Sequence, residues 1–252
     1  MIGVIDSGVG GISVLLEMHK RMSGHSFYYI ADSKWCPYGS KSYDEIQKRV
    51  FALADYLIEK GAEMIVIACN SATIAAVEAL RAHYPIQFIG MEPGVKPAAE
   101  ITQTHTIGVL ATEASLNGEK FHRLVSTHAF DLRVITQQCP KFTQLVEDGK
   151  LDGSEVESAI REYTDDMIHE GVDTIILGCT HYTFLKPALI KALPAHIKYI
   201  DTGRAVAKRV EKFKPTPSSN PRIHIFTTGE LDQLNRLLPR LCPELKVKTI
   251  AL

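Results

Sequence analysis

The stretch Lys60-Gly-Ala-Glu-Met-Ile-Val-Ile-Ala-Cys-Asn-Ser-Ala-Thr73 matches Glu170-Gly-Val-Asp-Thr-Ile-Ile-Leu-Gly-Cys-Thr-His-Tyr-Thr183 at an offset of 110 residues, with no gap. In both, a glycine and an acid precede an apolar run that ends in a small residue, a cysteine and a polar residue. A weaker match pairs Ile2-Gly-Val-Ile5 with Ile107-Gly-Val-Leu110 at an offset of 105 residues. Two matches at nearly one offset predict two related halves. The alternative is a chance similarity of two parallel strands.

Each copy of the repeat has the pattern of a buried strand that leads into a helix. Elsewhere, short β-branched runs alternate with helical periods such as Ile46, Val50, Leu53 and Leu57. The expected strands are Ile2–Ile5, Phe27–Ala31, Met64–Ala68, Phe88–Met91, Thr106–Leu110, Leu132–Thr136, Thr174–Gly178, Lys198–Ile200, Ile223–Thr227 and Val247–Ala251. This alternation predicts an α/β fold with two similar domains and mostly parallel sheets.

The domain boundaries are less strongly marked than the strands. We predict that residues 1–95 and 206–252 form the first α/β domain and that residues 96–205 form the second. Pro93-Gly94 and Asp201-Thr-Gly203 are the candidate crossings, and Pro215–Pro221 is a candidate surface loop. The last strand is expected to return to the first half, because the second half is complete without it.

Composition and charge exclude several classes of protein. Hydrophobic residues make up 45% of the 252 residues and charged residues 23%, as in ordinary globular proteins. The net charge of -1 gives no electrostatic reason to expect binding to nucleic acid or to a membrane surface. No apolar run reaches the ~18 residues that a membrane span needs. The N-terminus lacks the features of a signal peptide, so a cytoplasmic location is expected.

The cysteines do not form a disulfide or zinc pattern. Their number is odd, their spacing is wide and no Cys-x-x-Cys occurs, so neither a disulfide framework nor a structural metal site is expected. The five are Cys36, Cys69, Cys139, Cys179 and Cys242. Each is expected to be a free thiol, and any one of them alone could be a small buried hydrophobic residue.

Cys69 and Cys179 occupy a place where ligands bind. Each follows a buried strand and precedes a helical pattern, Ala75–Arg81 or Phe184–Lys191. Open α/β sheets bind ligands at the carboxyl ends of their strands, and the nearby helix N-termini are expected to lower the thiol pKa. The alternative, two packing cysteines, does not explain the polar residues that follow each one.

A pair of thiols suits one reaction type better than others. A nucleophile needs one thiol and a base, and a redox pair needs thiols close enough to bond. A racemase needs two groups on opposite faces of one carbon, one to remove the Cα proton and one to return a proton. Thiols can be tuned for both roles.

A glycine-rich turn, Gly8-Val-Gly-Gly11, follows Asp6-Ser7 at the end of the first expected strand. Its backbone amides could hold a phosphate or a carboxylate. The pattern is neither that of a dinucleotide-binding turn nor that of a P-loop, which disfavours nucleotide binding. A helix is expected from Gly8 to Leu15, for which Asp6 could be the N-cap.

Several motifs in order resemble those of the glutamate racemase family, in the aspartate/glutamate racemase superfamily. They are Ile5-Asp-Ser-Gly-Val-Gly-Gly11, Ala31-Asp32 with Pro37-Tyr-Gly39, Ala68-Cys-Asn-Ser71, Gly178-Cys-Thr-His-Tyr182 and Phe226-Thr-Thr-Gly229. The resemblance covers nearly the whole chain. It implies two α/β domains with the active site in the cleft between them, no cofactor and no metal. It also implies racemisation of L- and D-glutamate to supply D-glutamate for bacterial peptidoglycan, by a homodimer.

The resemblance also implies residue roles. Cys69 and Cys179 would be the acid–base pair, assisted by Asp6 and His181 respectively, with Glu147 as a further acid near the site. The substrate contacts would be Asp6, Ser7, Tyr38, Gly39, Asn70, Ser71, Thr180 and His181, with Thr112 and Ser115 nearby. Taken alone, His181 could be a half-buried structural histidine and Glu147 a solvated surface residue. Cys36 lies beside Pro37-Tyr38, but the motif gives it no role.

Three positions depart from the family pattern. Ser71 and Ser115 stand where threonine is commoner, and Thr183 stands where proline is usual. None of these changes removes a chemical group, so a shifted preference or a lower rate is the expected effect. Some members carry an N-terminal extension linked to activation by a peptidoglycan precursor. Here the first strand begins at Ile2, so activity without that precursor is expected.

Three other functions compete with glutamate racemisation. A racemase of a related amino acid such as aspartate is the nearest, although aspartate racemases tend to carry an acid where His181 stands. A thiol hydrolase or transferase would use Cys179 as nucleophile and His181 as base, and Cys69 would then be dispensable. A non-catalytic amino-acid binding protein would bind the ligand without turnover.

Overall fold

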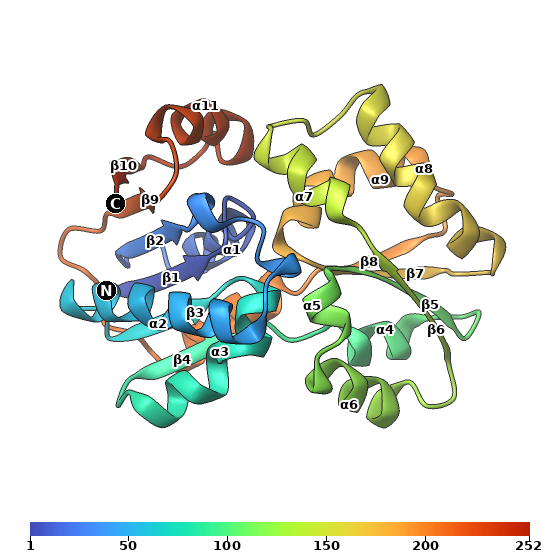
Figure 1. The fold of residues 1–252 in the computed structure, drawn as a ribbon, viewed down its shortest axis with the longest axis horizontal. Helices are drawn as coiled ribbons and strands as arrows, with labels where there is room; N and C mark the ends of the chain where they lie inside the picture. The colour runs from blue at the N-terminus through green and yellow to red at the C-terminus, as the bar shows by residue number, and fades with distance from the viewer.

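Two parallel sheets organise the computed structural model, which describes residues 1–252 (Figure 1). The six-stranded sheet has the order β10-β9-β2-β1-β3-β4, and the four-stranded sheet has the order β6-β5-β7-β8. The first contains β1 Ile2–Asp6, β2 Phe27–Ala31, β3 Met64–Ile67, β4 Gln87–Gly90, β9 Ile223–Thr227 and β10 Lys248–Ala251. The second contains β5 Thr106–Ala111, β6 Arg133–Gln138, β7 Thr174–Gly178 and β8 Lys198–Ile200. Every neighbouring pair is parallel, which confirms the α/β prediction.

The repeat in the sequence corresponds to a repeat in the sheets. The order β2-β1-β3-β4 in the first sheet is reproduced as β6-β5-β7-β8 in the second. The register is reproduced as well, because Ile2 pairs with Met64 and Ile107 pairs with Thr174. The two copies therefore lie on equivalent strands, β3 and β7. Strands β9 and β10 extend the first sheet beyond this shared order. The last strand therefore returns to the first half, as predicted.

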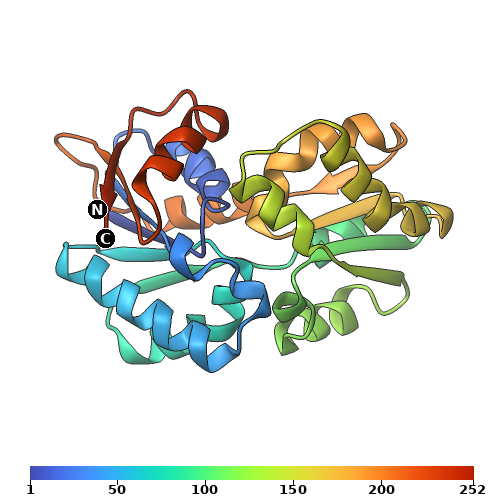
Figure 2. The same ribbon diagram turned by 45° about the horizontal axis from the view of Figure 1, so that its top comes forward.

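Helices cover both faces of the sheets (Figures 1 and 2). They are α1 Ile12–Arg21, α2 Tyr43–Glu59, α3 Asn70–His83, α4 Val95–Ile101, α5 Glu113–Leu116, α6 Glu119–His128, α7 Pro140–Glu147, α8 Ser154–His169, α9 Lys186–Ala192, α10 Gly203–Lys212 and α11 Leu231–Leu241. Three 3₁₀ turns are η1 Ser33–Trp35, η2 Tyr38–Ser40 and η3 Thr180–Leu185. None of the helices combines the length and the apolar character that crossing a bilayer requires.

Helix α2 shows why these segments fold as predicted. Ser42 and Glu45 form a reciprocal capping box, in which each side chain accepts a hydrogen bond from the other residue's backbone amide. The residues with helical spacing, Ile46, Val50 and Leu57, are buried along one face. The helix expected from Gly8 to Leu15 starts later than predicted and continues to Arg21. It begins at Ile12, because residues 8–11 form the turn that faces the second half.

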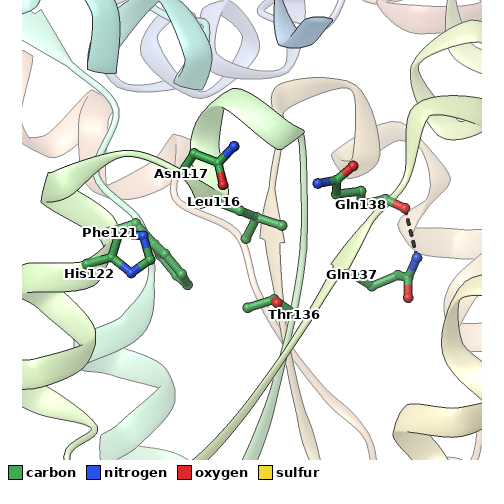
Figure 3. Close-up of a pocket in the computed structure, with 7 residues that line it drawn as sticks. All are labelled: Leu116, Asn117, Phe121, His122, Thr136, Gln137 and Gln138. Atoms are coloured by element: carbon green, nitrogen blue, oxygen red, sulfur yellow. Dashed lines mark hydrogen bonds between the residues drawn. The ribbon is translucent and has the colours of Figure 1, made fainter.

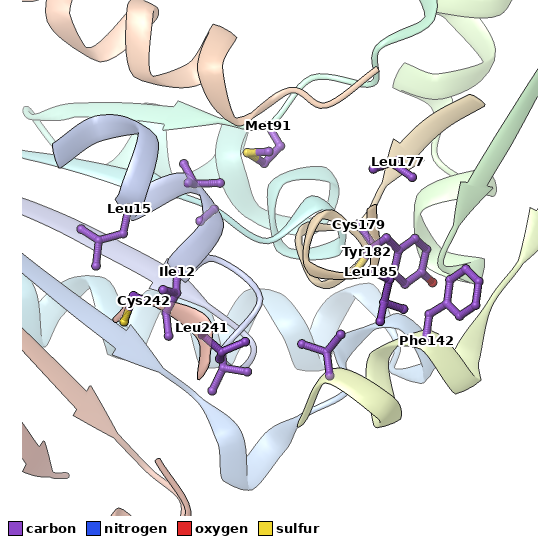
Figure 4. Packing of buried hydrophobic residues seen from close by; sticks show 14 of the residues in the cluster. Ile12, Leu15, Met91, Phe142, Leu177, Cys179, Tyr182, Leu185, Leu241 and Cys242 are labelled. Carbon is purple, nitrogen blue, oxygen red and sulfur yellow. The ribbon is translucent and has the colours of Figure 1, made fainter. Parts of the chain in front are cut away.

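One hydrophobic cluster joins the two halves. It contains Ile12 and Leu15 of α1 together with Tyr182 and Leu185 of η3, and Figure 4 shows these side chains, with Tyr182 and Leu185 beside Cys179. The C-terminal helix α11 lies beside the end of α7 in both ribbon views, and Gln233 donates a hydrogen bond to the backbone carbonyl of Glu147. The two halves are thus packed against each other at the carboxyl ends of their strands.

Candidate active site

The two repeat cysteines lie at equivalent strand ends and are both buried. Cys69 follows β3, and its sulfur accepts a hydrogen bond of 3.4 Å from the backbone amide of Ala72 at the start of α3. Cys179 follows β7 and precedes η3. Their exposed fractions are 6% and 8%. The two are close enough for a charge on Cys179 to raise the pKa of Cys69.

The surroundings of Cys69 favour the protonated thiol. Its Sγ lies 3.7 Å from Ser7 Oγ. Burial, followed by the negative charge of Asp6, raises the pKa of the Cys69 thiol to about 12. The sequence-based expectation of a lowered pKa is therefore wrong for Cys69. The amide of Ala72 does act in that direction, but desolvation is the larger effect.

Cys179 is the first member of a hydrogen-bonded chain. Its Sγ lies 3.6 Å from His181 Nδ1, and His181 Nε2 lies 2.7 Å from Glu147 Oε1. Burial alone would lower the pKa of His181, but its contacts with Cys179, Cys36 and Glu147 raise that pKa well above its ordinary value. Burial would raise the pKa of Glu147, but the His181 contact lowers it. A protonated His181 between two acidic groups is the arrangement that these shifts favour.

The structure contradicts two of the alternatives considered for the residues that support Cys179. Glu147 is 9% exposed and holds both His181 and the backbone amide of Val9, so it is not a solvated surface residue. His181 is 1% exposed and not half-buried. The reason is that Glu147, at the end of α7, is covered by the glycine-rich turn of the other half.

Asp6 connects the two halves. It is fully buried at the end of β1, where its Oδ1 accepts a hydrogen bond of 3.0 Å from the Gly8 amide. Its Oδ2 accepts a hydrogen bond of 3.2 Å from the Thr180 hydroxyl. Burial raises the pKa of Asp6, and the positive charge of His181 partly opposes this. Asp6 is not the N-cap of α1, because Gly11 occupies that position.

The glycine-rich turn is shaped by contact with the second half. A Cβ at Gly8 would overlap the Glu147 carboxylate, and a Cβ at Gly10 would overlap the His181 ring. The amide of Val9 donates a hydrogen bond of 2.8 Å to Glu147 Oε1. The Val9 amide of the turn thus holds the carboxylate of the protein's own Glu147.

The remaining predicted contacts form a polar rim around the thiols. Ser71 Oγ lies 2.9 Å from Thr112 Oγ1, which lies 2.9 Å from Ser115 Oγ, and this joins α3 to the start of α5. Gly39 packs against Thr112, where a Cβ would be too close. Asn70 is 7% exposed and its Oδ1 accepts no hydrogen bond, which is uncommon for a buried polar atom.

Sequence reasoning missed a buried network behind Tyr38. Asp32, at the end of β2, accepts hydrogen bonds from the hydroxyls of Tyr38 (2.5 Å) and Thr228 (2.7 Å). Arg49 of α2 binds both oxygens of Asp32, at 2.8 and 2.6 Å. Asp32, like Asp6, stands at the end of an expected strand, and this position was the signal from which the network could have been predicted. The Tyr38 hydroxyl therefore donates its hydrogen bond to Asp32.

A pocket on the second half includes neither of the two repeat cysteines. Figure 3 shows it beside β6 and the start of α6. Its lining residues are Leu116, Asn117, Phe121, His122, Thr136, Gln137 and Gln138. It contains no thiol and no carboxylate, so it lacks an acid–base pair. The cluster around the two buried cysteines does contain such groups.

The duplicated sheets and the two buried thiols define the class: a two-domain α/β protein with an acid–base site where its halves meet. The family profile described as Asp/Glu/Hydantoin racemase matches residues 2–210, and the chain belongs to this family. The glutamate racemase of Pseudomonas entomophila (strain L48) is 43% identical over 95% of this chain and 93% of the relative. That of Stutzerimonas stutzeri (strain A1501) is 42% identical over 96% and 94%.

Solved structures agree with this assignment. Glutamate racemase isoform RacE1 from Bacillus anthracis covers 100% of this chain and 97% of its own, with 29% identity and a TM-score of 0.89. Escherichia coli glutamate racemase, solved with L-glutamate and the activator UDP-MurNAc-ala, covers 99% and 96%, with 28% identity and a TM-score of 0.89. Picrophilus torridus aspartate racemase, at 18% identity and a TM-score of 0.53, shares the fold alone.

Proposed function

We propose that this chain interconverts L- and D-glutamate without a cofactor, with Cys69 and Cys179 as the two acid–base groups. The observation that carries the proposal is the pair of buried thiols on equivalent strands, each beside a different charged partner. The product would supply D-glutamate for bacterial peptidoglycan synthesis. The near full-length similarity to glutamate racemases, against a likeness in fold alone to an aspartate racemase, supports glutamate over aspartate.

The two environments suggest how the reaction starts from L-glutamate. Cys179, whose sulfur lies 3.6 Å from His181 Nδ1, would remove the Cα proton. Cys69, with its pKa raised to about 12, holds a proton that it can give to the opposite face. In the reverse direction the thiols exchange roles. Asp6 assists Cys69, and His181 with Glu147 assists Cys179.

The polar rim supplies the substrate contacts in this proposal. Ser7, Gly39, Ser71 and Thr180 would hold the carboxylate and amino groups, with the open Oδ1 of Asn70 as an acceptor for the ammonium. Asp6 and His181 would add charge, and Tyr38 would contribute its ring and backbone. Because these groups are largely buried, the two halves must separate for substrate to enter.

The direct test is the purified protein with L-glutamate and no added cofactor, followed by circular dichroism of the amino acid. Loss of optical activity with L-glutamate, but not with L-aspartate, is the expected result. Activity should survive dialysis against a chelator. An inactive protein that pyridoxal phosphate or a metal restores would contradict the two-thiol mechanism.

A thiol hydrolase is the second candidate, because Cys179, His181 and Glu147 have the order of a nucleophile, a base and an orienting acid. It requires no second thiol. A Cys69→Ala protein that still hydrolyses a thioester or amide substrate would favour it.

Three further predictions rest on the family resemblance and the strand order. We propose a homodimer, which light scattering after size-exclusion chromatography can test, and a cytoplasmic location, which cell fractionation can test. We also propose the domain division into residues 1–95 with 206–252 and residues 96–205. Helix α10, which begins at Gly203, packs against α1 of the first half.

A further inference from the structure

Three side chains capable of binding a metal ion meet at the edge of the thiol site. The ligand atoms of Cys36, Glu147 and His181 all lie within 4.8 Å of one another. Cys36 Sγ is 3.6 Å from Glu147 Oε1, which is 2.7 Å from His181 Nε2. Zinc bonds of about 2.0 to 2.3 Å place tetrahedral ligands roughly 3.3 to 3.5 Å apart. The cysteine and glutamate are thus already near ligand spacing, and the His181–Glu147 pair would open by roughly 0.6 Å.

The surroundings orient these ligands as a metal site requires. The Val9 amide holds Glu147 Oε1, and Cys179 contacts the other ring nitrogen of His181. Such outer contacts fix the direction of ligating side chains. Cys36 is only half-buried, so an ion can reach the cluster from its side. The three residues are distant in sequence, which is why no zinc spacing is visible there.

We propose that Cys36, Glu147 and His181 bind a thiophilic divalent cation such as Zn²⁺, and that the bound ion inhibits the protein. On binding, the thiol proton of Cys36 and the Nε2 proton of His181 pass to solvent, and the sulfur and nitrogen lone pairs coordinate the ion. Inhibition follows because bonds to the ion replace the His181–Glu147 hydrogen bond that supports the imidazole beside Cys179. The ion also ties Cys36 of the first half to the second half, which keeps the site closed.

Binding can be tested without any assay of activity. The full chain is titrated with Co²⁺, and the sulfur-to-cobalt charge-transfer absorption is recorded and then displaced with Zn²⁺. The band is expected in the unchanged protein and in Cys242→Ala, whose thiol lies in the core near α11. It is expected to disappear in Cys36→Ser and Cys36→Ala. Absence of the band in the unchanged protein, or its persistence in both Cys36 variants, overturns the proposal.

The inhibition itself rests on the proposed racemase function, and it is measured separately. For each protein, activity is expressed relative to its own value without metal, and circular dichroism verifies folding. The Zn²⁺ concentration for half-inhibition should rise by roughly tenfold or more in Cys36→Ala and stay unchanged in Cys242→Ala. Equal sensitivity of Cys36→Ala would mean that the catalytic thiols capture the ion, which overturns the assignment. A protein that binds Co²⁺ but does not racemise glutamate refutes the proposed function, not the metal site.

Discussion

The Cys69 half and the Cys179 half place their thiols on equivalent strands but surround them differently. Cys69 has a hydroxyl and a buried carboxylate beside it, from Ser7 and Asp6. Cys179 has an imidazole that Glu147 supports from behind. Burial and the negative charge of Asp6 favour the protonated thiol at Cys69. The repeat thus gives the two thiols equivalent positions, and the residues around them make their environments different.

This asymmetry does not make one direction of the reaction favourable. L- and D-glutamate have equal free energies in water, so every variant must change kcat/KM equally in both directions. A fall in kcat/KM therefore shows that the pair of thiols no longer works, but it does not show which half the substitution has affected. Variants of the supporting residues and isotope labelling are needed to separate the halves.

The largest expected effect is the loss of either thiol. Cys69→Ala and Cys179→Ala should each lower racemisation by about a thousandfold or more, because a one-sided site cannot invert the carbon. Circular dichroism of the amino acid measures the rate, and Cys139→Ala, which removes a buried thiol outside the pair, is the matched control. Full activity in Cys69→Ala would show that the two thiols are not partners and would favour the hypothesis that Cys179 is a nucleophile.

A smaller loss is expected when the support of Cys179 is weakened. Glu147→Gln should lower kcat by about tenfold to a hundredfold, since the thiol and the imidazole remain. The contact with Glu147 helps to raise the pKa of His181, so the variant should have a lower His181 pKa. His181 then loses its proton at lower pH, and the alkaline fall of activity should move to lower pH.

The measurement is the pH profile of kcat/KM, with Glu157→Gln as control. Glu157 pairs with Lys191 on the exposed face of α8. An unchanged alkaline limb in Glu147→Gln would show that Glu147 does not act through His181.

A third change tests the contact between the halves. Gly10→Ala places a methyl group against the His181 ring and should cost about 1–3 kcal/mol of stability, with lower activity. Gly24→Ala, where a Cβ meets nothing within 4 Å, should stay within about 0.5 kcal/mol. Urea unfolding of both variants measures the difference. Equal stabilities would indicate that the turn can move away from His181 at little cost.

Much of the fold could be predicted from the sequence because its signals are local. The repeat around Cys69 and Cys179 predicted equivalent strands, and each expected strand is present within one or two residues at its ends. Helical spacing predicted the buried face of α2. The start of α1 was misplaced, because nothing local distinguishes a glycine turn that contacts the other half from a first helical turn.

The sequence indicated which residues form the candidate site, but it did not indicate their burial or the direction of their pKa shifts. The sequence left Glu147 either as an acid near the site or as a solvated surface residue, and its burial depends on the Val9 turn, 138 residues away in the chain. The pKa of Cys69 was expected to be low from the helix N-terminus, but its direction is set by burial and Asp6. Arg49 lies in a helical pattern with no mark of its contact with Asp32. Such features arise only when the two halves and the distant elements are packed together.

The smallest signal, and the one that distinguishes the halves, is the deuterium label. From L-glutamate in heavy water, Cys179 would remove the Cα proton and Cys69, equilibrated with solvent, would return a deuteron. Early D-glutamate should therefore carry deuterium at Cα, and recovered L-glutamate should carry almost none. Chiral separation followed by mass spectrometry at early times measures both.

The starting enantiomer extends this test to the other half. From D-glutamate the roles exchange, so label should appear early in L-glutamate and not in recovered D-glutamate. A single base serving both faces would return part of its own proton, giving unlabelled product and labelled substrate. Substantial deuterium in recovered L-glutamate before product accumulates would mean that the Cys179 side exchanges and reprotonates by itself. The two halves would then not be partners, and the difference between Asp6 and His181 would not set the order of proton transfer.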